Sequence, residues 1–313
     1  MMTPEELRDR LRGPVVAMTT HFKEDYSLDL EAVERLTAFY VEQRVPTVIV
    51  TGSTGEYGAL KDEERRAVQK IAIETARGSG MTVIAGISDM ASLKCIEHAE
   101  IAEKLGADGA MLTPPLAATN GGGFPALQRH YDAVTSATQI GIVIYFSGAV
   151  LWQVREIIAR PQLMLDLVAS CNGHAAGFKD ASGSFPFYRQ HSQLLKGKVA
   201  TMGSAGMNYY LWGHEFGSPC FLTGLGNIWP KWEIDFYNHL VEGRRDEAVK
   251  IVKEKDLPYL AVTKETGRYW ACVKALQEMI GLPGGKMRPP LMECTSEQRE
   301  KLKKVCTEIG LMQ

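Results

Sequence analysis

The feature of this 313-residue chain that most constrains its fold is a regular alternation of short apolar runs with amphipathic segments. A uniformly apolar run is typical of a strand buried on both faces, whereas apolar residues every three or four positions are typical of a helix with one buried face. The runs predicted to form strands are 13–22, 46–51, 81–85, 106–112, 141–145, 175–179, 199–202 and 220–223.

A helical pattern follows each of these runs up to Val241. The segments are 28–39, 63–77, 92–104, 125–137, 151–159 with an extension over 162–169, 187–195, 207–212 and 230–241. Eight such units predict an α/β fold, a (β/α)8 TIM barrel in which helices cover a closed parallel sheet. An open doubly wound sheet is the alternative, and the absence of a dinucleotide-binding glycine fingerprint disfavours it.

The strand pattern ends at Gly243. Residues 245–255, 259–281 and 296–309 are helical in pattern, and Pro258 and a loop separate them. We therefore predict a catalytic barrel over 1–242 and a helical C-terminal domain over 243–313. Because no flexible linker joins them, we expect the extension to pack on the barrel or on a neighbouring subunit.

Composition excludes several classes of protein. The net charge is −2, with positive and negative residues interspersed, so the sequence shows no concentration of basic residues that would indicate binding to nucleic acid or to an anionic membrane. No apolar run approaches the ~20 residues of a membrane span, and the N-terminus lacks the apolar core of a signal peptide. The six cysteines show no metal-binding spacing, so we expect reduced thiols in a cytoplasmic protein.

Lys179 is the first candidate for chemistry. It stands near the C-terminal end of the sixth predicted strand, where a barrel strand delivers its side chain to the active face. Partial desolvation there lowers the pKa of a lysine and favours imine formation with a carbonyl substrate. Most lysines at strand ends simply reach solvent, so the functional interpretation depends on what the other strand ends supply.

Two further strand ends supply suitable groups. After the second strand the segment 51–56 reads TGSTGE, where glycines let backbone N–H groups converge and Ser53 and Thr54 add hydroxyls, a combination suited to a carboxylate or phosphate. A structural turn with a helix cap is the alternative. The fifth strand ends at Tyr145, either a phenol that moves protons or an ordinary core aromatic.

Several motifs together resemble one known family. They are residues 52–56, the strand ending in Tyr145, and residues 177–182, 281–283 and 288–290. In this order, and nearly end to end, they are similar to the dihydrodipicolinate synthase and N-acetylneuraminate lyase superfamily of class I Schiff-base aldolases. The resemblance implies a barrel with a helical C-terminal domain, a homo-oligomer (tetramer or dimer), a pyruvate-type 2-oxo acid substrate, and neither metal nor other cofactor.

Matching of the motifs also implies residue roles. Lys179 would form the Schiff base and Tyr145 would shuttle protons. The turn with Gly52, Ser53 and Thr54 would hold the 2-oxo acid carboxylate. At the end of the eighth strand, Leu222 and Thr223 match the position where backbone atoms approach the substrate.

Some positions depart from the family pattern. Leu116 stands where synthases have a relay tyrosine, and Val150 stands where they have an arginine that grips the second substrate. Residues 146–149 read FSGA, not the usual Asn-x-Pro run. Loss of a guanidinium clamp argues against aspartate semialdehyde as partner and against sialic-acid specificity.

Other features near the predicted active face have simpler interpretations. The loop 117–123 is either a lid or a plain surface loop. For His21 and His174 we expect packing or surface roles in preference to acid–base chemistry. The loops after the last two strands show no clear phosphate-binding pattern, which disfavours a phosphate-binding barrel.

We therefore predict a Schiff-base lyase of the aldolase type that acts on a pyruvate-type 2-oxo acid. Leu116 and Val150 predict an apolar distal pocket and a poorly charged aldehyde partner. Residues 177–180 also resemble 5-dehydro-4-deoxyglucarate dehydratases, so a deoxy-sugar-acid dehydratase is the first alternative. A non-catalytic 2-oxo acid binding protein is the second.

Overall fold

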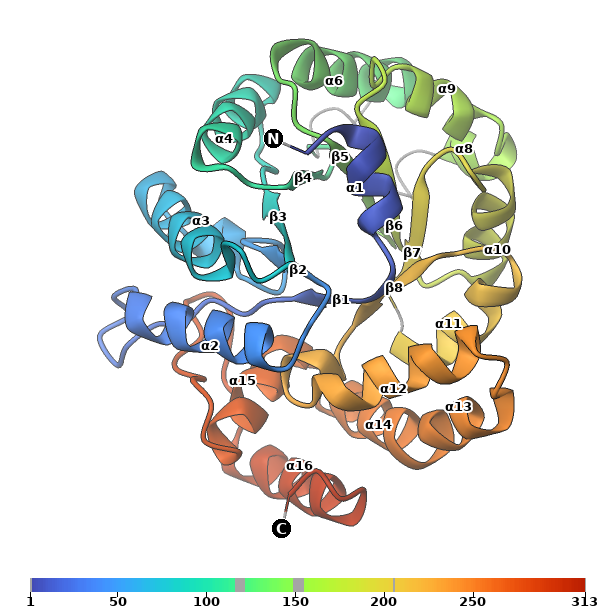
Figure 1. Cartoon of the computed structure of the whole chain (residues 1–313). Coiled ribbons are helices and arrows are strands. Elements are labelled where there is room, and N and C mark those ends of the chain that lie inside the picture. The colour runs from blue at the N-terminus through green and yellow to red at the C-terminus, as the bar shows by residue number, and fades with distance from the viewer. Residues whose placement is uncertain (1, 116–121, 149–154, 205, 313) are drawn as a thin grey trace.

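The computed structural model describes residues 2–115, 122–148, 155–204 and 206–312. Within them, parallel strands run in the order β7-β6-β5-β4-β3-β2-β1-β8, and β7 lies beside β8, so that the barrel is nearly closed (Figure 1). The predicted barrel is confirmed. The strands are β1 (Gly13–Ala17), β2 (Thr47–Val50), β3 (Thr82–Gly86), β4 (Gly109–Leu112), β5 (Ile142–Ser147), β6 (Ala175–Ala181), β7 (Ala200–Gly203) and β8 (Cys220–Thr223).

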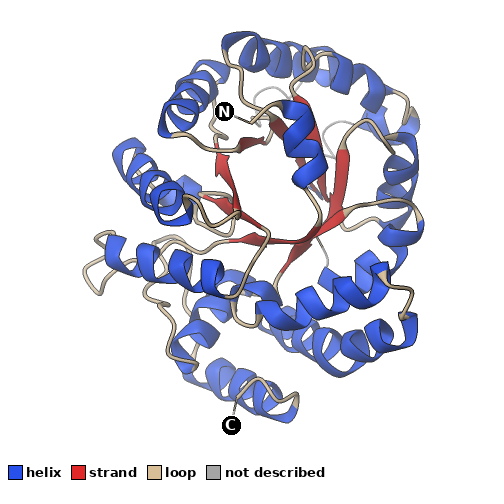
Figure 2. Ribbon diagram, viewed as in Figure 1, coloured by secondary structure: helices blue, strands red, loops and turns tan. Residues whose placement is uncertain are grey.

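Helices surround the strands on the outside of the barrel (Figure 2). Between residues 30 and 195, the apolar faces of the helices pack on the outward-facing strand residues and form a large buried cluster. The helices are α1 (Pro4–Arg10), α2 (Leu30–Glu42), α3 (Asp62–Ala76), α4 (Ser92–Leu105), α6 (Gly123–Ala137), α8 (Arg155–Ala159), α9 (Leu163–Ala169), α10 (Phe185–Leu194), α11 (Gly206–Glu215), α12 (Pro230–Val241), α13 (Arg245–Ile251), α14 (Leu257–Thr266), α15 (Tyr269–Met279) and α16 (Ser296–Glu308).

The N-terminal end of the barrel is closed by α1, which lies across the near end in Figure 1. Leu7 and Leu11 are fully buried there, in one cluster with the inward-facing strand residues. Contact is so close that a Cβ atom on Gly109 would lie 2.4 Å from Leu7 Cδ2. The sequence pattern did not predict α1, although a Thr3 capping box and Pro4 mark its start. The opposite, C-terminal end of the strands is left to build a site.

The C-terminal region is helical and packs closely on α11 and α12. One buried cluster runs from Met207 to Leu311 and so crosses the predicted boundary at residue 242. Pro258 was expected to interrupt the helices, but the chain stays helical through it, because a π-turn over Val252–Asp256 precedes it. The break comes instead at Gly267, where φ is +64°.

In the described part of the chain, no helix is both long enough and apolar enough to cross a membrane.

Candidate active site

Lys179 lies at the centre of the candidate site. Its side chain comes from β6, next to Tyr145 of β5, and these two residues are partners in the register of the two strands. Lys179 is only 4% exposed, and its Nζ atom lies 3.8 Å from the centre of the Tyr145 ring. Burial lowers the pKa of Lys179 to about 7. A large fraction of the amine is therefore neutral and nucleophilic near neutral pH.

Tyr145 is a phenol within reach of the same reaction centre. It belongs to the cluster of inward-facing residues and is nearly buried. Burial raises the pKa of Tyr145, and a hydrogen bond with the Ser53 side chain opposes that shift. The structure thus brings Ser53, Tyr145 and Lys179 together, as the sequence predicted. A protonated phenol between a lysine and a serine is placed to pass protons to and from a bound substrate.

The 51–56 turn at the end of β2 has a tightly determined backbone. Thr51 and Glu56, at its two ends, have left-handed φ angles of 52° and 54°. Such angles cost about 1 kcal/mol or more in residues other than glycine and persist where surrounding contacts enforce them. Thr51 accepts a hydrogen bond from Gln69 (2.8 Å), and Thr20 donates one to the Gly55 carbonyl (2.8 Å). These contacts fix the backbone of the turn and so fix the positions of Ser53 and Thr54.

A buried ion pair holds the far end of this turn. Glu56 pairs with Lys274 of α15, and both side chains are at most 2% exposed. The second carboxylate oxygen of Glu56 accepts a hydrogen bond from the Arg288 N–H (3.1 Å). Lys274 also donates to the Lys286 carbonyl (2.7 Å). The helical C-terminal region therefore fixes the turn that was predicted to hold the substrate carboxylate.

The end of β8 contributes the opposite wall. Leu222 faces the barrel interior and Thr223 is buried behind it. Glu233 of α12 is completely buried near Thr223 and the N–H groups of Gly224 and Gly226, yet no described group reaches its carboxyl oxygens with good hydrogen-bond geometry. Burial raises the pKa of Glu233 well above its usual range, which favours the protonated form of this carboxyl group.

A cleft of about 530 Å³ opens between these strand ends and α14. We call it the β8–α14 cleft. Its volume falls within the roughly 300–1,000 Å³ of ordinary ligand sites. It is lined by Thr54, Ser204, Gly206, Leu222, Thr223, Gly224, Asp256, Tyr259, Leu260, Thr263, Lys264, Gly267 and Tyr269.

Sequence reasoning did not single out Lys274, Glu233 or Asp256. Lys274 and its partner Glu56 are 218 positions apart, and no local pattern links them. One signal was available: Lys274 is a charged residue on a helix whose neighbours are otherwise apolar (YWACVKAL). A lone charge in such a setting indicates a buried ion pair.

Neither of the two histidines weighed as acid–base candidates lines the β8–α14 cleft. His21 is buried and its Nδ1 atom contacts the Gly284 carbonyl at 2.7 Å. Burial lowers its pKa to about 4, so the ring is neutral and packs the C-terminal loop on the barrel. His174 precedes β6 and so lies at the opposite end of the barrel from Lys179.

Several of the predicted features lie outside the described residues. They are Leu116, Val150, most of the loop 117–123, and the last position of the segment 146–149. The apolar distal pocket inferred from Leu116 and Val150 therefore stays a prediction.

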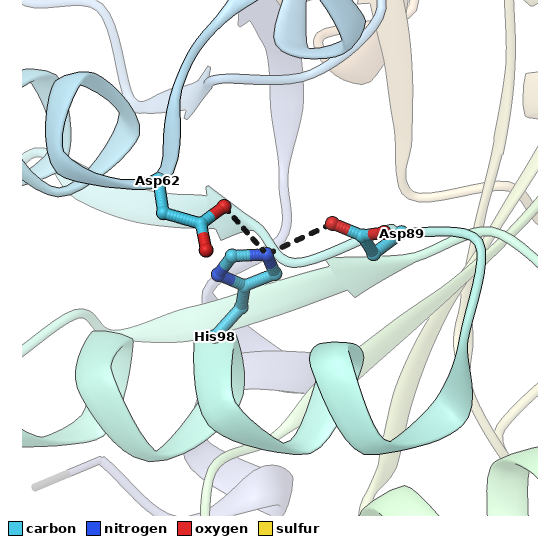
Figure 3. Close-up of side chains that lie close together, drawn as sticks. All are labelled: Asp62, Asp89 and His98. Atoms are coloured by element: carbon cyan, nitrogen blue, oxygen red, sulfur yellow. Dashed lines mark hydrogen bonds and ion pairs between the residues drawn. The ribbon is translucent and has the colours of Figure 1, made fainter.

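One group in the described part of the chain has the composition of a metal site. Asp62, Asp89 and His98 have ligand atoms within 4.8 Å of one another. Figure 3 shows both carboxylates turned toward one ring nitrogen of His98. That nitrogen contacts Asp89 at 3.1 Å, and Asp62 is paired with Lys94 at 3.2 Å. These contacts already occupy the group, which links α3 to α4 outside the barrel, so we interpret it as structural.

Comparison with known proteins agrees with this geometry. The family model described as the dihydrodipicolinate synthetase family matches residues 10–309. The chain belongs to this family. Its members are lyases of the aldolase type, which confirms the resemblance drawn from the sequence motifs and the general class of enzyme.

Two relatives illustrate its place in the family. A probable 5-dehydro-4-deoxyglucarate dehydratase of Methylobacterium radiotolerans is 27% identical over 96% of each chain. A 4-hydroxy-tetrahydrodipicolinate synthase of Archaeoglobus fulgidus is 29% identical over 96% of this chain and 99% of the relative.

Solved structures show the same fold. The dihydrodipicolinate synthase of Aquifex aeolicus superimposes with a TM-score of 0.83 at 24% identity, over 96% of this chain and 99% of the other. A monomeric dihydrodipicolinate synthase variant gives a TM-score of 0.85 at 22% identity, over 97% and 98%.

Proposed function

We propose that this family member is a class I lyase that forms a Schiff base between Lys179 and a pyruvate-type 2-oxo acid. The observation that carries the proposal is the environment of the Lys179 side chain and its effect on the pKa of the amine. It is nearly buried at the C-terminal end of a barrel strand, its pKa is lowered to about 7, and a phenol lies beside it. A neutral amine in that position is a nucleophile toward a ketone.

The residues around Lys179 have complementary roles in this proposal. Nζ attacks the C2 carbonyl, and the carbonyl oxygen leaves as water after it takes up protons. In an aldol cleavage the resulting protonated imine accepts the electron pair of the C3–C4 bond. In a dehydration it accepts the electron pair of a C3–H bond, and the enamine formed then expels the C4 hydroxyl, which takes up a proton and leaves as water. Tyr145 delivers and removes protons during these steps, and its hydrogen bond with Ser53 orients the phenol. Ser53 and Thr54 hold the substrate carboxylate through hydroxyl and backbone N–H groups.

Dehydration of a deoxy-sugar acid is a second candidate reaction. The name of the relative from Methylobacterium radiotolerans favours it. So does the cleft, because it is lined by the polar residues Thr263 and Lys264 of α14 and by Asp256 of the π-turn before it. Hydroxyl and carboxylate groups of a sugar acid fit such a wall better than an apolar aldehyde does.

A screen for turnover tests the proposal and separates the two reactions. Purified protein is incubated with 4-hydroxy-2-oxo acids and with 5-dehydro-4-deoxyglucarate, and pyruvate, other carbonyl products and water elimination are followed. We expect turnover of at least one member, and loss of at least about 10³-fold in Lys179→Ala, because the nucleophile is gone. Full activity of this variant would refute the mechanism.

We also propose that the chain forms a homo-oligomer. Trp212 on α11 is 52% exposed and lies against Phe185 of α10, and an exposed aromatic group of this kind is typical of an interface. Light scattering of the purified protein and of Trp212→Glu tests this. We expect a multimer that the substitution dissociates, and a monomeric wild-type protein would contradict it.

A further inference from the structure

We propose that the β8–α14 cleft binds the far end of the substrate, with Asp256 holding a hydroxyl group and Lys264 holding a terminal carboxylate. The substrate class is then a hydroxylated 2-oxo acid with a second carboxylate at its other end. The inference rests on the proposed function, because Lys179 and the 51–56 turn place the 2-oxo end.

The cleft has the position and size for such an occupant. Its lining includes Thr54, Leu222 and Thr223, so it begins at the predicted 2-oxo acid site. It extends from there to α14 and encloses about 530 Å³. Pyruvate has six non-hydrogen atoms and would occupy only the inner end. A longer substrate chain therefore has room to continue along the cleft toward α14.

One face of α14 and the π-turn before it forms the outer wall. Asp256, Leu260, Thr263 and Gly267 line the cleft at intervals of three or four residues, with Lys264 beside Thr263, as expected for one face of a helix. The π-turn Val252–Asp256 ends at Asp256 and changes which side chains face the cleft. Single π-turns within helices are frequent at functional sites.

Asp256 is a buried carboxyl group that suits a hydroxyl ligand. It is 2% exposed, and its Oδ2 atom accepts a hydrogen bond from the Asn208 N–H at 2.8 Å. Burial raises its pKa to about 7, so a substantial part of it is protonated at neutral pH. A carboxylic acid both donates and accepts hydrogen bonds, which matches an alcohol. Glu233 and Tyr269 lie close enough for the charge of Asp256 to raise their pKa values, and burial raises both further, which favours their uncharged forms.

Lys264 supplies a positive charge two helical turns further along. Its side chain is exposed at the outer end of the cleft. The adjacent acid on the helix, Glu265, is paired with Lys301 at 2.6 Å. An ammonium group at this place favours a carboxylate at the end of the ligand opposite the 2-oxo group.

Three variants and three ligands test the inference. The variants are Asp256→Ala, Lys264→Met and, as a matched control, Lys253→Met. The control removes an exposed charge just before α14 at a position that does not line the cleft. The ligands are pyruvate, 2-oxoadipate with a second carboxylate, and 5-dehydro-4-deoxyglucarate with hydroxyls as well. Binding is measured by titration calorimetry, and imine formation by reductive trapping on the folded protein.

The pattern of changes across the ligands decides the question. We expect Lys264→Met to weaken binding of both dicarboxylates about 10-fold or more, as for loss of a charge-assisted hydrogen bond, and to leave pyruvate unchanged. We expect Asp256→Ala, which removes both the donor and the acceptor, to weaken binding of 5-dehydro-4-deoxyglucarate by a similar factor, with little effect on 2-oxoadipate. Lys253→Met should change none of the three.

Equal effects on all three ligands, or no effect of Lys264→Met on the dicarboxylates, would overturn the inference. Because Lys264 is exposed, its variant is expected to fold, and a thermal melt checks this. Failure of the wild-type protein to form any imine with pyruvate would instead refute the proposed function. Calorimetry with the dicarboxylates still reports on the cleft in that case.

Discussion

The ion pair between Lys274 and Glu56 offers a sharp test of how the C-terminal helices support the site. Both side chains are buried, and the pair joins α15 to the 51–56 turn. Lys274→Met removes the positive charge and leaves the Glu56 carboxylate with the Arg288 N–H as its remaining described hydrogen-bond donor. Loss of one partner of a buried pair typically costs about 3–5 kcal/mol of unfolding free energy.

A double variant separates the interaction energy of the pair from the cost of each single substitution. Glu56→Gln combined with Lys274→Met removes both charges, so we expect its loss in unfolding free energy to be well below the sum of the two single losses. The exposed pair Lys301–Glu265 is the control, and Lys301→Met should cost about 1 kcal/mol or less. Urea denaturation measures all of these values.

The same variants also report on function. Glu56 is held in a left-handed conformation, so loss of its partner lets the turn relax and displaces Ser53 and Thr54. We expect Lys274→Met to raise the KM for the 2-oxo acid about 10-fold or more, in line with loss of a charge-assisted hydrogen bond. A stability loss no larger than that of Lys301→Met, or strictly additive single variants, would refute the reasoning.

Three further predictions address other parts of the structure. Tyr145→Phe should lower turnover by about 10²–10⁴-fold, yet still form the reducible imine, because it removes only proton transfer; loss of imine formation would contradict this role. Arg288→Lys should lower the unfolding free energy by about 1–2 kcal/mol in thermal melts, because lysine cannot form both hydrogen bonds that the Arg288 guanidinium donates to Glu64 (2.6 and 2.7 Å). An unchanged melting temperature would contradict this prediction. Hydrogen peroxide should form a disulfide between Cys272 and Cys294, whose sulfur atoms lie 3.7 Å apart, before any disulfide that involves the other four cysteines. Detection of another disulfide first, by mass mapping, would contradict this.

The barrel and the arrangement of its strand ends could be predicted from the sequence for a physical reason. A buried parallel strand must be apolar over its whole length, so the runs before Lys179, Tyr145 and the 51–56 turn were visible without a structure. Because the C-terminal ends of barrel strands meet at one face, their residues were expected to converge. The structure brings Lys179, Tyr145 and Ser53 together.

What could not be predicted depends on contacts between distant parts of the chain. Glu56 and Lys274 become partners only when α15 packs against the barrel. Asp256 lines the cleft as the last residue of a π-turn, and the chain stays helical from this turn through Pro258. Neither feature has a local sequence pattern, since a single proline normally indicates a helix break.

The pH dependence of imine trapping tests the central claim most directly. The protein is incubated with pyruvate and sodium cyanoborohydride between pH 6 and 10, and the modified lysine is mapped by mass spectrometry. The neutral amine is the reactive form, and burial lowers the pKa of Lys179 to about 7. We therefore predict one adduct, on Lys179, whose initial rate rises with pH to half its maximum near pH 7. Absence of the adduct or its appearance on another lysine would contradict the account. So would a rate that still rises steeply at pH 10, as for the ordinary lysine pKa of about 10.4.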